Sequence, residues 1–540
     1  MKLLVLWCIV WATIGLYAQS ETPEPFNISL EEITLTNTPG VQSFAVGQDD
    51  QGRWLIIGGR TDGLHLRRPF ESFLASDNNR QVIVIDPTLD KVYFSPLTVL
   101  STGLQEQLQS TNMEFYQRDD RLYIIGGYAY SNTAGDHITF PNLTAVDVPG
   151  AIQAVISQQS IAPYFQQITD NRMQVTGGYL GYLDSLFYLV GGQKFIGRYN
   201  PMGPGHGPGF VQEYTNAIRT FKIKDDGQTI AITDYQETVD SAHLHRRDYN
   251  MAPQIFPDGT PGFTVFSGVF QYTADLPWLN TVDITANGYQ VRPNFNQYLS
   301  QYHSAHVPIY DAAGNAMHTI FFGGMSRYTL DPVSGQLVDD QNVPFVKTIS
   351  QVTRYASDSM VEMTLPISMP GFLGSSAEFI PRHDLDYSYG EILNLNSLPK
   401  GKTHIGYIYG GIESTAPNIF FINDGTQSEA TNRCFAVYLE KGTATGTTPV
   451  PITGEQVLGL EVAPNPSDSQ TKVTFWLPDP MPVSLQVHNV HGQLMRSLSF
   501  GSLTAGTYRQ SLSVSGWPKG VYLITLRGGP LQKTIRFVKQ

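Results

Sequence analysis

The stretch Arg53-Trp54-Leu55-Ile56-Ile57-Gly58-Gly59, an apolar strand that ends in two glycines, decides the fold of this 540-residue chain. The pattern returns five times along the sequence. The later copies end at Gly126-Gly127, Gly191-Gly192, Ser267-Gly268, Gly323-Gly324 and Gly410-Gly411. The first members of successive pairs are 68, 65, 76, 56 and 87 residues apart. This spacing is irregular for a solenoid but suits repeated blades that carry insertions.

Each doublet strand lies among three further strands. Around the first doublet, QSFAVGQ precedes it, and QVIVID and KVYFSPL follow it. Four short strands per repeat form the blade of a β-propeller, and paired glycines permit close backbone approach and torsion angles closed to other residues. The sequence therefore predicts an all-β fold with a six-bladed propeller over residues 19–442. Five or seven blades, or another all-β repeat such as an array of sandwiches, remain alternatives.

The ends of the repeat array predict how the ring closes. The sixth unit runs into a Gly- and Thr-rich segment before any fourth strand appears. An unpaired strand, Leu30 to Thr36, precedes the first blade and reads like the last strand of the fifth. We expect residues 30–36 to close blade six, because exchange of a strand between the termini removes an exposed sheet edge.

The doublet strands resemble kelch repeats over roughly residues 27–442, with the glycine pair carrying the resemblance. The fourth pair is Ser267-Gly268, and the spacings exceed the usual kelch period of about 50 residues. The resemblance implies a propeller whose ligands bind around the mouth of the central channel. Some kelch propellers are enzymes, among them a copper oxidase with a Tyr–Cys crosslink and a sialic acid epimerase.

The N-terminus predicts export. Lys2 precedes an almost wholly apolar run, Leu3 to Leu16, and Ala18 lies before a plausible cleavage point, so residues 1–18 are predicted to be a signal peptide. The two cysteines are Cys8 and Cys434, which excludes a disulfide framework and a cysteine-based zinc site. No other segment is long and apolar enough for a spanning helix, so we expect no transmembrane segment in the mature chain.

Composition changes near the C-terminus. Residues 443–454 lie in a Gly-, Thr- and Pro-rich stretch that predicts a linker. Residues 455–540 hold eight Lys or Arg and four Asp or Glu, a net charge of +4, whereas residues 1–454 carry −17. Alternating strands separated by turn residues predict a small immunoglobulin-like β-sandwich of about seven strands.

The C-terminal segment resembles the sorting domain of the type IX secretion system of Bacteroidetes. Four ordered motifs and a basic last strand carry the resemblance. The motifs are VAPNP at 462–466, NVHGQL at 489–494, LTAGTY at 503–508 and GVYL at 520–523. The resemblance implies transport across the outer membrane by the secretion machinery, followed by removal of the domain or its exchange for a surface lipid anchor. The protein is expected to be secreted or held on the outer cell surface.

Candidate ligand-binding residues come from loops at the predicted channel mouth, the end where loops lead into the first strand and leave the second strand of each blade. They are Arg60, Tyr128, His243, His245, Arg247, His303, His306 and Arg327. Adjacent blades would bring the four histidines to one side, as a metal or anion site or as imidazoles that hydrogen-bond neighbouring loops. The prediction assigns no metal, no cofactor and no catalytic residue.

These observations favour a propeller that binds an extracellular protein or glycan. The net charge of −13 argues against nucleic acid, which needs a basic surface. Two alternatives remain: a carbohydrate-active enzyme with an epimerase- or oxidase-like site at the channel mouth, and a surface adhesion scaffold. The single mature cysteine lies in a late strand, which speaks against the oxidase type, whereas available arginines leave the epimerase type open.

Overall fold

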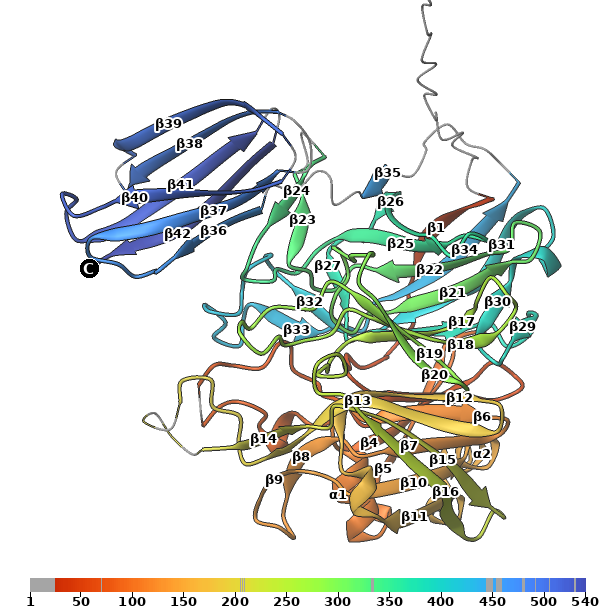
Figure 1. The fold of residues 1–540 in the computed structure, drawn as a ribbon. Coiled ribbons are helices and arrows are strands. Elements are labelled where there is room, and N and C mark those ends of the chain that lie inside the picture. The colour runs from red at the N-terminus through yellow and green to blue at the C-terminus, as the bar shows by residue number, and fades with distance from the viewer. Residues whose placement is uncertain are drawn as a thin grey trace, which may run out of the picture.

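The computed structural model describes most of the propeller and the C-terminal domain, which are the two bodies visible in Figure 1. The described residues are 25–68, 70–203, 205, 207, 209–331, 335–442, 450–452, 459–477, 481–490, 492–504, 506–528 and 531–540. The predicted signal peptide, residues 1–18, lies outside them, as does most of the predicted linker.

Six four-stranded antiparallel units form the propeller, so the all-β, six-bladed fold predicted from the doublets is confirmed. Blade one holds β2 (Ala45–Gln48), β3 (Trp54–Ile57), β4 (Gln81–Asp86) and β5 (Lys91–Pro96), and blade two holds β6 (Glu114–Arg118), β7 (Arg121–Ile125), β10 (Asn142–Asp147) and β11 (Phe165–Thr169). Blade three holds β12 (Thr176–Leu183), β13 (Leu186–Ile196), β15 (Ala217–Asp225) and β16 (Ile230–Val239), and blade four holds β17 (Asn250–Ile255), β18 (Pro261–Phe266), β19 (Thr281–Thr285) and β20 (Gly288–Arg292). Blade five holds β21 (His306–Asp311), β22 (Ala316–Phe322), β25 (Thr348–Arg354) and β26 (Met360–Ser368), and blade six holds β28 (Glu378–Pro381), β31 (Gly401–Tyr409), β34 (Cys434–Lys441) and β1 (Phe26–Ile33).

Insertions between these strands account for the irregular spacing of the doublets. The inserted strands are β8 (Tyr128–Ser131), β9 (Asp136–Thr139), β14 (Val211–Tyr214), β23 (Tyr328–Leu330), β24 (Leu337–Asp339), β27 (Phe372–Ser375), β29 (Tyr387–Ser388), β30 (Ile392–Asn394), β32 (Ile412–Ser414) and β33 (Ser428–Ala430). The helices α1 (Thr102–Leu108) and α2 (Val148–Ile156) contribute to the apolar core between blades one and two.

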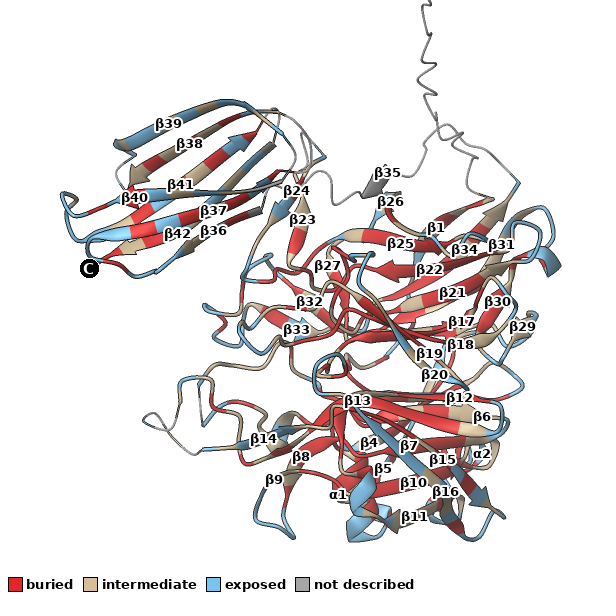
Figure 2. Ribbon diagram, viewed as in Figure 1, coloured by how far each residue is buried: buried red, intermediate tan, exposed pale blue. Residues whose placement is uncertain are grey.

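The inner strands of the blades are largely buried, as the red segments of Figure 2 show. All four residues of β3 are buried, because neighbouring strands flank it and neighbouring blades cover both of its faces. The doublet directly follows the second strand in five blades, whereas in blade three β13 continues through Gly191 and Gly192 to Ile196. All twelve doublet residues, Ser267 included, have a positive φ between 58° and 105°. This left-handed conformation explains why glycine recurs there.

An N-terminal strand completes blade six. β1 pairs antiparallel with β34 over eight residues, from Phe26 opposite Lys441 to Ile33 opposite Cys434. The sequence placed this strand at residues 30–36, but the structure ends it at Ile33. Phe26 and Ile28 extend the buried core at its start, whereas the chain turns away after Ile33.

A ring of backbone hydrogen bonds joins all six blades at the channel mouth. Each bond links the residue leading into one blade's first strand to its counterpart in the next blade. The donor–acceptor pairs are Ser43 to Ser376, Ser376 to His303, His303 to Asp248, Asp248 to Gly177, Gly177 to Asn112 and Asn112 to Ser43, at 2.7–3.3 Å. The series returns to its starting residue, so the ring is closed with one member from each blade.

An insertion of blade six, between β28 and β31, lies at the opposite end of the channel. Its strand β30 pairs in parallel with β21, the innermost strand of blade five. A Cβ on Gly390 would lie 2.9 Å from the Tyr116 hydroxyl of blade two, and one on Gly52 of blade one would lie 2.7 Å from His383. The insertion therefore touches several blades across the ring axis.

The C-terminal domain is a seven-stranded sandwich, as the sequence predicted. Its three-stranded sheet holds β36 (Gly459–Ala463), β37 (Gln470–Leu477) and β40 (Gly506–Ser513), and its four-stranded sheet holds β39 (Leu494–Leu503), β38 (Met481–Asn489), β41 (Gly520–Gly528) and β42 (Leu531–Lys539). It has an apolar core of its own, with fully buried residues such as Val473 and Phe537.

The predicted linker is not wholly irregular. Residues Val450–Ile452 form β35, which extends blade five by pairing with β26. The outer edge of a blade presents unpaired backbone N–H and C=O groups, and the short strand β35 forms hydrogen bonds with them. A further contact joins the C-terminal domain to blade five, where Lys533 Nζ lies 3.0 Å from Asp339 Oδ2.

Candidate functional site

The channel mouth lies at the left of Figure 1, where β8, β14 and β33 project. The loop that follows the first doublet crosses this end of the ring. Its His65 ring contacts Tyr199 of blade three at 4.7 Å and Phe420 of blade six at 5.8 Å between ring centroids. Burial lowers the pKa of His65 to about 4, so this imidazole is neutral and serves as packing.

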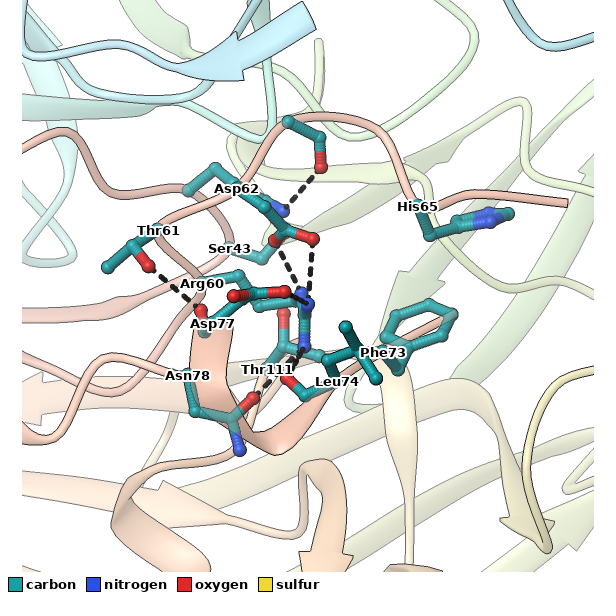
Figure 3. Close-up of polar contacts among 12 residues, drawn as sticks. Ser43, Arg60, Thr61, Asp62, His65, Phe73, Leu74, Asp77, Asn78 and Thr111 are labelled. Carbon is teal, nitrogen blue, oxygen red and sulfur yellow. Dashed lines mark hydrogen bonds and ion pairs between the residues drawn. The ribbon is translucent and has the colours of Figure 1, made fainter. Parts of the chain in front are cut away.

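Arg60, predicted to bind ligand, is instead part of the framework. Figure 3 shows its guanidinium enclosed by Asp62, Asp77 and Asn78. It forms two hydrogen bonds of 2.7 Å to the Asp62 carboxylate and only 2% of its side chain is exposed. A cation that is paired and buried in this way fixes the loop and is not available to a ligand.

The side chains of Tyr128 and Arg327 likewise form hydrogen bonds within the protein. The Tyr128 hydroxyl donates to the Gly197 carbonyl at 2.8 Å, and its ring is buried. Arg327 makes two hydrogen bonds of 2.8 Å to Asp339, the carboxylate that also contacts Lys533. Tyr128 begins the inserted strand β8 and Arg327 lies in a loop at the mouth, and the described side-chain hydrogen bonds of both run to other parts of the protein.

The segment holding His243 and His245 has no regular secondary structure and leads into blade four. Their two rings therefore have separate surroundings. His243 is about half exposed, and its Nδ1 lies 2.7 Å from the Asp240 carboxylate. His245 Nδ1 lies 2.9 Å from the Asn216 side-chain oxygen.

His245 is the middle ring of a three-ring stack. Its ring centroid lies 3.7 Å from that of Tyr214 and 3.9 Å from that of Tyr272, with interplanar angles of 21° and 24°. Burial, and next the charge of Arg247, lower the pKa of His245, so the ring is neutral near pH 7. Tyr272 is 58% exposed and its hydroxyl donates to the Ser241 carbonyl at 2.8 Å. One face of a firmly held aromatic ring is therefore open to solvent at the mouth.

Arg247 lies beside this stack. Its Nε donates to the Tyr214 hydroxyl at 3.0 Å, its guanidinium stacks 4.8 Å from the Phe270 ring centroid, and it forms an ion pair with Asp248. Burial opposes the charge, but Asp248, Tyr214 and Tyr302 together outweigh it, and the pKa of the guanidinium rises above its ordinary value. Arg247 retains 16% exposure and is a permanent cation near the channel.

The other predicted pair of histidines lies deeper in the ring. His303 Nε2 is 3.4 Å from Glu378 Oε1 of the next blade, and His306 Nδ1 is 2.9 Å from the Ser304 carbonyl oxygen. Burial lowers the pKa of His303 to about 4 and raises the pKa of Glu378 to about 8. At neutral pH this pair is therefore an uncharged imidazole and a protonated carboxyl group rather than an ion pair.

The structure does not unite the four histidines. Each has a different partner, and among the described residues no three His, Cys, Asp or Glu side chains gather closely enough to hold a metal ion.

Sequence reasoning missed the acidic groups inside the channel. The blade-six insertion brings in Glu391, whose pKa burial raises to about 7, and its charge acts on Glu378 and Tyr179. The sequence signal for this insertion is the 87-residue spacing before the last doublet. The sequence offers no signal for the parallel pairing that places it at the axis.

Comparison with known proteins identifies the C-terminal domain. Residues 461–540 match the family of secretion system C-terminal sorting domains. This domain is a type IX sorting domain. The protein is therefore exported, to the cell surface or into the medium, as the sequence predicted, and its sorting domain engages the secretion machinery. No helix among the described residues is long and apolar enough to cross a membrane.

Comparisons with the whole chain are less informative. No curated protein matches it. The solved structure of YjhT is similar at 9% sequence identity and a TM-score of 0.40, over 76% of this chain and 99% of that chain. The six-bladed propeller is established by the sheets and the closed hydrogen-bond ring.

Proposed function

We propose that the exported propeller binds an extracellular glycan through the face that surrounds its channel mouth. The observation that carries the proposal is the Tyr214–His245–Tyr272 stack. Sugars pair their C–H faces with aromatic rings, and a ring already held in place loses little conformational entropy on binding. Tyr272 is fixed on one face by His245 and at its hydroxyl by Ser241, so its open face is preorganised.

Charge near the stack suits a polar ligand. Arg247 presents a permanent guanidinium beside Tyr214, and such a fork donates hydrogen bonds to hydroxyl or carboxylate oxygens. Its ion pair with Asp248 keeps the local charge near zero, so the ligand need not be an anion.

A protein ligand is the second candidate. Three large apolar side chains on loops at the mouth are well exposed: Phe70 at 64%, Phe421 at 61% and Ile422 at 63%. Exposed apolar groups near arginines are typical of protein interfaces, and Arg67 stacks on Phe421 at 4.4 Å.

Binding of the chain from residue 19 onward to a glycan array tests the proposal. We expect defined glycans to bind and Tyr272→Ala to weaken them at least tenfold, about 1.4 kcal/mol. Phe94→Ala is a matched control, because Phe94 is 39% exposed on the outer strand of blade one. Absence of glycan binding, or equal binding by Tyr272→Ala, would refute the glycan proposal.

Two further results would replace the proposal by an alternative. Binding of a surface protein that Phe421→Ala abolishes and Tyr272→Ala does not would support the protein ligand. Conversion of a bound glycan into a product would support the enzyme.

A further inference from the structure

A second, separate pocket lies between blades four and five, away from the mouth. Its volume is about 450 Å³, within the range of about 300–1,000 Å³ in which small ligands bind. Its walls come from the β17–β18 turn, from β19 and β20, and from the turn between β25 and β26. None of the candidate residues predicted from the sequence lines it.

The pocket exists because polar side chains replace apolar packing at this edge of the interface. Asp283, 3% exposed, accepts a hydrogen bond of 2.6 Å from Thr264 and pairs with Arg292 and Arg354. Both arginines also pair with Asp358, at 2.7 and 2.6 Å. These ion pairs hold the two blades together, and the small Thr285 and Gly288 beside them leave the space open.

Two arginines in this wall, Arg292 and Arg354, balance Asp283 and Asp358. Asp258 on the β17–β18 turn adds a third carboxylate, so the pocket is weakly negative and repels an anionic ligand. The remaining lining is mixed: Thr260, Asn287 and Gln290 supply hydrogen-bonding groups, and Phe256 supplies an aromatic surface. A ligand that fits has many hydroxyl groups, no negative charge and an apolar face.

We infer that this pocket between blades four and five binds a neutral sugar residue. Sugars satisfy both kinds of lining, because their hydroxyls both donate and accept hydrogen bonds while their C–H faces pack on aromatic rings. The Arg–Asp network is already formed in the free protein. Its side chains therefore need not be ordered at the moment of binding, which lowers the entropic cost.

Ligand-observed saturation-transfer NMR tests the inference, with glucose, galactose, mannose and N-acetylglucosamine as separate probes. The sample is the chain from residue 19 onward. At least one sugar should show saturation transfer with a Kd in the millimolar range. Gln290→Trp should reduce the signal at least tenfold, because Gln290 lies on β20 and the indole would fill the pocket.

Gln236→Trp is the matched control, since Gln236 lies exposed on β16, the outer strand of blade three, and should leave the signal unchanged. Asn287→Ala is a second, milder test, because it changes an exposed turn and keeps the inference testable if Gln290→Trp misfolds. It should weaken binding severalfold. No transfer to any of the four sugars at 50 mM, or full binding by both Gln290→Trp and Asn287→Ala, would overturn the inference.

Sugar binding in the pocket and glycan binding at the mouth can be distinguished with the same variants. Tyr272→Ala should leave the sugar signal of the pocket intact, and Gln290→Trp should leave array binding at the mouth intact. If Tyr272→Ala alone removes the monosaccharide signal, the sugar binds at the mouth and the pocket inference fails while the proposed function stands.

Discussion

Polar residues of the same type at the mouth have different roles. Some are buried and hold the loops in place, whereas others are exposed on the surface, and the residue type does not show which. Arg60 and Arg68 lie eight positions apart on one loop. Arg60 is 2% exposed and pairs with Asp62 and Asp77, whereas Arg68 is 59% exposed and pairs with Glu71. Removal of one partner from a buried pair leaves uncompensated charge, which an exposed pair does not.

Arg60→Ala should therefore lower the free energy of unfolding by about 3 kcal/mol, measured by urea denaturation. Arg68→Ala, its control on the same loop, should cost no more than about 1 kcal/mol. Similar losses for the two variants would contradict the framework role of Arg60.

Ionisation of Glu378 makes the stability of the folded propeller depend on pH. Its pKa in the folded protein is about 8, above its ordinary value of 4.5, so the native state holds this proton more tightly than the unfolded state does. Its contribution is therefore fully present below about pH 4.5 and is lost as pH rises to 8. His303 opposes this at lower pH, because its pKa is lowered to about 4 and stability falls as pH drops from 6.5 toward 4.

Glu378→Gln keeps the shape of the protonated carboxyl group and cannot ionise. The variant should lose at least about 1 kcal/mol less stability than the wild type between pH 5 and pH 8, measured by urea denaturation at both values. Glu391 still titrates in the variant, so part of the pH dependence should persist. Parallel pH profiles for the two proteins would show that Glu378 is ordinary in the folded state.

At the scale of elements, the sequence was sufficient wherever a local rule determined the outcome. The doublets predicted the blades, because two successive residues with left-handed backbone torsion angles are usually glycines, which makes the position visible in the sequence. Contacts between distant segments were not predictable in this way. The stack of His245 on Tyr214 depends on β14, an insertion of blade three, and Glu391 reaches the axis through the parallel pairing of β30. Neither contact leaves a periodic or compositional trace in the chain.

The strand β1 is the element on which ring closure depends. It contributes eight residue pairs to blade six and buries Phe26 and Ile28. A chain that begins at residue 34 should melt at least about 5 °C lower than one that begins at residue 19, because loss of even one such apolar side chain costs about 2–4 kcal/mol. Differential scanning calorimetry gives the comparison.

Glu32→Ala is the control for this truncation. Glu32 lies in β1 and pairs with Arg433, but its side chain is 49% exposed, so the change should cost less than about 1 kcal/mol. An unchanged melting temperature after truncation would mean that the ring closes without β1.

At the scale of the whole molecule, two bodies of opposite charge have different tasks. The C-terminal domain has its own core, and the described contact between charged groups of the two bodies is the ion pair between Lys533 and Asp339. The basic sorting domain directs export, and the acidic propeller is the part of the chain that it carries.

Deletion of residues 461–540 should trap the propeller in the periplasm, because these residues are the ones that match the sorting family. Cell fractionation with an antibody against the propeller measures this, and the retained protein should stay folded, since the closed ring of six hydrogen bonds lies wholly outside the deleted segment. Lys533→Ala is the control: it breaks the ion pair with Asp339 but leaves the sandwich intact, so export should continue. Surface display of the truncated chain at the wild-type level would show that the propeller carries its own export signal and that the domain is dispensable for sorting.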